Sequence, residues 1–180
     1  MTSIKRGTPT RIDVNGGAYP GMHLSSVTFG VASDVPDVVL GSTTTATSDY
    51  TTGDFTLFYV TPGVFVYDII VNPYWKSAFS STGTPAPTLG MSSDLDGFFT
   101  STDLSFSDNV VTTMKHSGLS TGAENLACDA RGRFITTGDE RSTEAGTTDC
   151  AKIDLSVVTS DYGAGSGIVY LMWFAKNAMG

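Results

Sequence analysis

The most hydrophobic stretch of the chain runs from Gly167 to Ala175, close to its end. Its apolar side chains occupy positions of both parities, which is typical of a strand that is covered on both faces. Such a stretch cannot fray in water, so it is predicted to lie inside a sheet or against another subunit. Two layers of a single domain that cover the strand on both faces would explain its apolar residues equally well. We hypothesise that five residues of this stretch form the subunit interface of a closed homo-oligomer, for example a trimer. These residues are Ile168, Tyr170, Leu171, Trp173 and Phe174.

Composition favours many short strands over helices. The 180 residues include 20 Ser, 26 Thr and 20 Gly, whereas Glu and Lys, which long amphipathic helices need, are scarce. The length suits a single domain. We therefore predict an all-β fold, a β-sandwich or jelly roll, in residues 26–180. The density of Gly and Pro in residues 1–25 predicts an extended N-terminal arm.

Charge is distributed unevenly along the chain. Lys5, Arg6 and Arg11 lie in the first twelve residues without any acid, whereas the whole chain has a net charge of −8. An acidic body argues against nucleic-acid binding, which needs a basic face. The basic arm is suited to docking onto an acidic partner. No apolar run approaches the roughly 20 residues of a membrane helix, and Met1–Val14 lacks the apolar core of a signal peptide. No membrane partner is expected.

Alternating apolar residues predict several strands, of which two pairs are expected to form hairpins. Phe55–Val60 and Val64–Val71 are separated by Thr61-Pro62-Gly63, a favourable turn sequence. Ile153–Val157 is expected to pair in the same way with the terminal strand. Other strands are predicted at 27–31, 88–91, 98–101, 110–115 and 133–136. Residues 38–40 and 43–47 are predicted to form a further strand, or one strand with a bulge at Gly41. Residues 119–130 are the best helical candidate, and 137–149 is predicted to be an exposed loop.

Candidate sites for chemistry are few, and each has an ordinary structural explanation. Asp94-Leu95-Asp96-Gly97 resembles the start of a calcium loop, but the closing Glu is missing, so an Asp-Gly turn is favoured. His23 and His116 lie in no catalytic sequence motif. We predict no enzymatic activity, no catalytic residue, no metal and no cofactor.

Two further groups of residues have alternative interpretations. Tyr50, Tyr74 and Trp75 could form an aromatic platform for a sugar, although large aromatic residues at strand ends more often seal a core. Cys128 and Cys150 could form a disulfide if their Cα atoms lie within about 7 Å. Burial as two small apolar side chains is the slightly favoured alternative.

One stretch of the sequence resembles a segment of small structural proteins of tailed bacteriophages. The similar residues are Ser77-Ala78-Phe79, Thr88-Leu89-Gly90, Asp94-Leu95-Asp96-Gly97-Phe98-Phe99 and Thr102-Asp103-Leu104. The resemblance covers under a fifth of the chain. It implies an all-β virion protein of the head-decoration or cement type, which binds the major capsid protein or another virion protein and is assembled in the host cytoplasm. Lys5, Arg6 and Arg11 would then dock the arm onto the capsid. A phage tail or fibre component and a carbohydrate-binding module are the alternatives.

Overall fold

The computed structural model describes residues 10–12, 22–34, 36–40, 53–81, 83–92, 94–106, 110–113, 133–134, 142–143, 147–158 and 162–175. These residues form thirteen strands and one short 3-10 helix, Ala32–Asp34. No α-helix occurs in the described part of the chain. The predicted all-β class is confirmed. The helical candidate at 119–130 lies outside the described residues.

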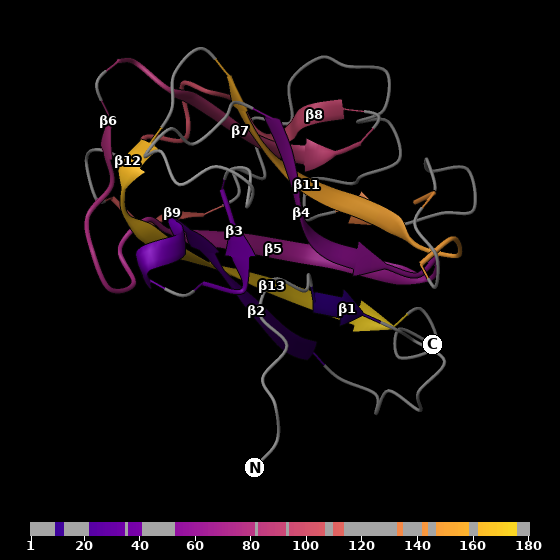
Figure 1. Cartoon of the computed structure of the whole chain (residues 1–180). Helices are drawn as coiled ribbons and strands as arrows, with labels where there is room; N and C mark the ends of the chain where they lie inside the picture. Colours follow the sequence, from indigo (N-terminus) through magenta and orange to yellow (C-terminus); the bar gives the residue numbers. More distant parts are fainter. Residues whose placement is uncertain are drawn as a thin grey trace.

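Two sheets lie face to face (Figure 1). The first has the order β1 (Thr10–Ile12), β4 (Gly53–Val60), β11 (Ala151–Val158), β7 (Ala86–Met91) and β8 (Asp94–Phe99). The second has the order β10 (Arg133–Phe134), β5 (Val64–Asn72), β13 (Ser166–Ala175), β2 (Met22–Gly30) and β3 (Val38–Val39), with β9 (Thr112–Thr113) also paired to β5. A separate ladder joins β12 (Tyr162–Ala164) to β6 (Ser80–Ser81).

The strand order is that of a jelly roll. The long strands β2, β13 and β5, continued by β10, face the antiparallel set β4, β11, β7 and β8. Along the sequence the chain passes from β2 to β4, from β4 to β5, and from β5 to β7, changing sheet each time. Such crossings between two antiparallel sheets define the double Greek key of this architecture. The short strands β1 and β3 add to its edges in parallel.

Neither predicted hairpin is present. The turn at Thr61–Gly63 occurs where expected, with Gly63 at a φ of 91°, but β4 and β5 lie in different sheets. Likewise β11 pairs with β4 and β7, whereas β13 pairs with β2 and β5. Val60 and Val64 on either side of the turn are both fully buried. The turn therefore carries the chain across the core, so that the two strands face each other across it.

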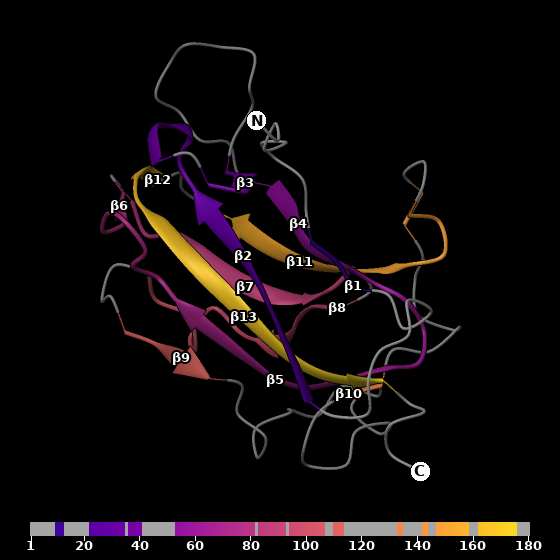
Figure 2. The ribbon, with the colours of Figure 1, turned by 90° about the horizontal axis from the view of Figure 1, so that it is seen from below.

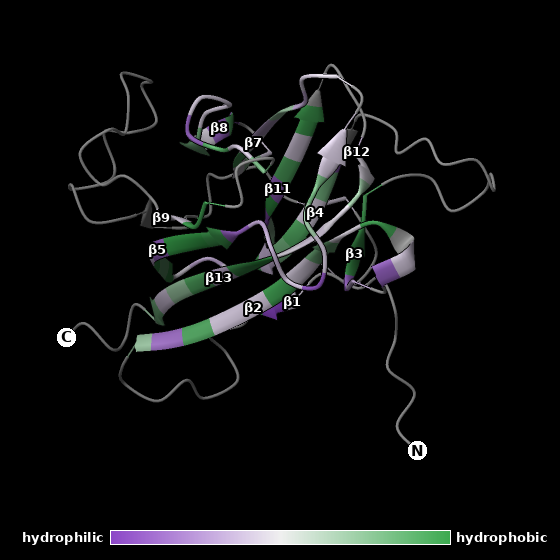
Figure 3. Cartoon of the chain, turned by 90° about the vertical axis from the view of Figure 1, so that its left-hand side faces the viewer, coloured by the Kyte–Doolittle hydropathy of each residue, from purple (hydrophilic) through white to green (hydrophobic). Residues whose placement is uncertain are grey.

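The core fills the space between the two sheets. Alternate residues of the long strands point into it, as the period of two along a strand requires. Figure 3 shows the hydrophobic colouring along β4, β5, β11 and β13, which supply most of these side chains. Val27 and Phe29 of β2, both fully buried, confirm the sequence pattern in that strand. The resulting core includes Leu57, Phe58, Val66, Ile69, Leu89, Ile153, Leu155, Val169 and Leu171.

Aromatic residues close one end of the sandwich. The ring of Phe79 lies 5.6 Å from that of Phe29, 5.0 Å from that of Phe106 and 4.9 Å from that of Tyr162, measured between centroids. Burial raises the pKa of the Tyr162 hydroxyl. Gly165 lies beneath Phe79 at a φ of +122°, a conformation that favours glycine. This packing joins β2, the loop before β6 and the loop before β13.

The N-terminal segment differs in part from the expected arm. Strand β2 starts at Met22, so the predicted boundary between residues 25 and 26 lies inside a strand. Thr10–Ile12 forms β1, which pairs in parallel with Phe58–Val60 of β4, and the Ile12 side chain is buried in the core. Thr10–Ile12 and the start of β2 therefore belong to the two sheets, because their backbone groups pair with neighbouring strands and the Ile12 side chain packs in the core. The remaining residues of the segment lie outside the described residues.

Candidate interaction surfaces

Strand β13 lies in the middle of its sheet, and its pleat separates the five residues predicted to form an interface. Leu171 is 0% exposed and Trp173 is 7% exposed, and both belong to the core. The indole Nε1 of Trp173 donates a hydrogen bond to Ser25 Oγ at 3.0 Å. These two residues therefore pack against the other sheet and cannot contact a second subunit in this fold, which corrects the hypothesis for both of them.

The other three predicted residues lie on the outer face of the same sheet. Ile168, Tyr170 and Phe174 alternate with the core residues and are half-buried. Neighbouring strands contribute further apolar side chains, since Met172 pairs with Leu24 of β2 and Tyr170 pairs with Ile70 of β5. Both parities of β13 are apolar because one faces the core and the other forms this outer surface.

The strands β2, β13 and β5 run side by side (Figure 2), and a groove crosses their outer face. It has a volume of about 430 Å³ and is lined by Met22, His23, Leu24, Ile70, Tyr170 and Met172. Met22 and Leu24 are 54% and 64% exposed, high values for large apolar side chains. We call the outer surface of β2, β13 and β5 the apolar face. Exposed apolar surface of this kind is typical of sites that bind another protein.

The outer face of the other sheet is polar. Asp54 of β4 pairs with Ser156 of β11, which in turn pairs with Thr88 of β7. The buried carboxylate of Asp154 accepts hydrogen bonds from Thr56 Oγ1 at 2.7 Å and from Ser92 Oγ at 2.8 Å. Buried carboxylates need such partners, and Asp154 has them. The sandwich therefore has one polar outer face and one apolar outer face.

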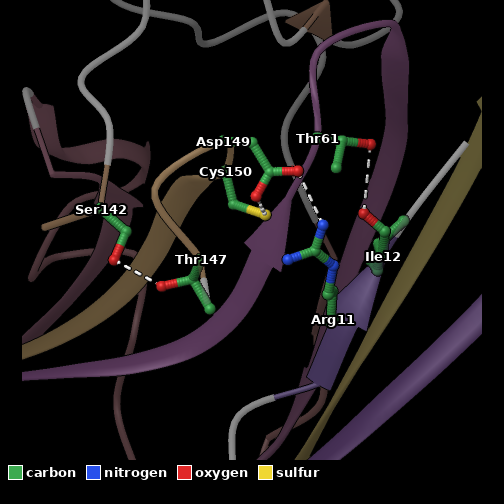
Figure 4. Close-up of polar contacts among 7 residues, drawn as sticks. All are labelled: Arg11, Ile12, Thr61, Ser142, Thr147, Asp149 and Cys150. Atoms are coloured by element: carbon green, nitrogen blue, oxygen red, sulfur yellow. Dashed lines mark hydrogen bonds and ion pairs between the residues drawn. The ribbon is translucent and has the colours of Figure 1, made fainter. Parts of the chain in front are cut away.

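Arg11, the last of the three basic residues predicted to dock the arm, forms an ion pair within its own chain. Its Nη2 lies 2.7 Å from Asp149 Oδ2, and the pair links β1 to the segment that precedes β11 (Figure 4). Thr61 strengthens the attachment of β1, because its backbone N–H donates to Ile12 O at 3.1 Å. Lys5 and Arg6 lie outside the described residues.

The ion pair has a measurable consequence for Asp149. The hydrogen bond from Arg11 holds the pKa of the Asp149 carboxyl below its usual value, with a smaller lowering contribution from the Cys150 thiol. A folded-state pKa below the unfolded value stabilises the fold above the unfolded pKa, and this contribution is lost as pH falls through the folded pKa. We expect Arg11→Ala to raise the pKa of Asp149 in an NMR titration. Lys76→Ala, remote from Asp149 in the sequence, serves as the control and should leave it unchanged.

The other candidate sites of the sequence are placed as follows. Asp94, Asp96 and Gly97 lie within strand β8, so the favoured Asp-Gly turn is wrong: the strand begins at Asp94 and not at Phe98. The described residues contain no group of three or more His, Cys, Asp or Glu side chains placed to hold a metal ion. His23 stacks on Trp173, with ring centroids 4.5 Å apart. His116 lies outside the described part of the chain.

The aromatic and cysteine candidates are also partly placed. Tyr74 is exposed, but the amino group of Lys76 lies 4.1 Å from the ring centroid of Trp75 and so occupies one face of that ring. Tyr50 is not among the described residues. Cys150 is buried, and Cys128 again lies outside the described residues, so their pairing stays untested. No helix among the described residues is long and apolar enough to cross a membrane.

Comparison with known proteins finds similarity of fold only. No family model matches the sequence, and no curated protein matches it significantly. Two solved chains are similar in structure. One belongs to the capsid asymmetric unit of cyanophage Pam1, with 12% identity, a TM-score of 0.50 and coverage of 97% of this chain and 99% of that chain. The other belongs to the acid-stable capsid structure of Helicobacter pylori bacteriophage KHP30, with 11% identity, a TM-score of 0.47 and coverage of 86% and 88%.

Proposed function

We propose that this protein is a structural component of a bacteriophage virion, of the decoration or cement type, that binds and stabilises the assembled head. The observation that carries the proposal is the fold likeness to a chain of the Pam1 capsid, which extends over nearly the full length of both chains. A jelly roll hosts many functions, so the fold alone does not decide between them. The resemblance of the segment between Ser77 and Leu104 to phage structural proteins is a separate argument for the same role.

The partner in this proposal is the major capsid protein, and the location is the virion. A decoration protein needs a rigid body and a segment that reaches a neighbouring subunit. Residues 1–9, which precede β1, carry Lys5 and Arg6 and no acid. They are the part of the arm assigned to docking, because Arg11 is already paired with Asp149. Exposed ion pairs contribute only about 0 to 1 kcal/mol each, so several contacts must act together.

A two-stage experiment tests the proposal. Virions of the phage that encodes this chain are purified, and the amount of the protein per particle is measured by quantitative gel electrophoresis. Antibody labelling in the electron microscope then distinguishes heads from tails. We expect many copies per particle, all on the head. Absence from purified virions contradicts a virion role, and labelling confined to tails would support the tail or fibre alternative.

The docking role of the arm is tested on heads that have been stripped of the protein. We expect a chain lacking residues 2–9 to fold as before, since β1 remains, but to rebind with lower occupancy and stronger salt dependence. The double variant Lys5→Gln, Arg6→Gln should weaken binding in the same direction. Deleting residues 2–12 is not a suitable test, because it removes β1 and the buried Ile12. Full occupancy by the shorter deletion would show that the arm is not the anchor.

A further inference from the structure

We draw no further inference here: the strongest candidate, the groove on the apolar face of β2, β13 and β5, carries nothing, because Asp68 lies in the same row as Leu24 and Met172 and nothing in the described part of the chain shows what covers this face.

Discussion

Leu171→Asp is expected to abolish folding, whereas Met172→Asp, one residue along the same strand, is expected to give folded, soluble protein. Leu171 is completely buried between the two sheets, and Met172 lies on the apolar face. Burying an unpaired carboxylate in an apolar core costs several kcal/mol, a large share of the roughly 5 to 15 kcal/mol by which domains are stable. The measurement is the yield of soluble protein together with its near-ultraviolet circular dichroism spectrum.

A milder substitution makes the same comparison quantitative. Leu171→Ala should lower the free energy of unfolding by about 2 to 5 kcal/mol, the range for leucine truncation in packed cores. Met172→Ala should lower it by well under half as much, because its side chain keeps contact with solvent. Urea unfolding curves provide both values. Equal losses for the two variants would contradict the assignment of β13 to the centre of a sandwich.

Gly165→Ala is the second substitution with a large expected effect. A Cβ at this position would lie 2.5 Å from Phe79 Cγ, and the φ of +122° is one that residues other than glycine rarely adopt. Backbone strain of this kind costs about 1 to 3 kcal/mol, and overpacking a filled core costs typically 1 to 3 kcal/mol more. We expect a combined loss of about 2 to 6 kcal/mol in the free energy of unfolding, measured by urea denaturation.

Gly163→Ala is the matched control for this prediction. A Cβ on Gly163, two residues earlier in the same segment, would meet no heavy atom within 4 Å. Its effect should be close to zero or slightly stabilising, because alanine restricts the unfolded chain. A loss at Gly163 as large as that at Gly165 would show that the segment is sensitive to any side chain, and not to the packing beneath Phe79.

The two faces of β13 limit what this strand can contribute to assembly. A partner can reach only the residues that share a face with Met172, namely Ile168, Tyr170 and Phe174. The contrast with the polar outer face of the other sheet gives the sandwich a single strongly apolar side.

Local features of the fold could be predicted from sequence because they depend on neighbouring residues. Alternating apolar residues predicted strands at Val27–Val31 and Ile153–Val157, and β2 and β11 confirm them. The turn at Thr61–Gly63 was also predictable, since proline and glycine restrict or permit particular backbone angles. The interface hypothesis had part of its basis in sequence, because apolar residues of both parities in β13 require cover on both faces.

The pairing of these strands was decided only by the tertiary structure. A period of two tells which side chains are buried, but both neighbours in a sheet and facing strands across a core satisfy the same pattern. The two predicted hairpins failed for this reason, since β4 and β5, like β11 and β13, lie in opposite sheets. The groove could not be predicted either, because Leu24, Ile70 and Tyr170 come from strands far apart in sequence. Sequence alone determined strands such as β2 and β11 and the need to cover β13, whereas long-range packing determined that Leu171 and Trp173 face the core while Tyr170 and Met172 face outward.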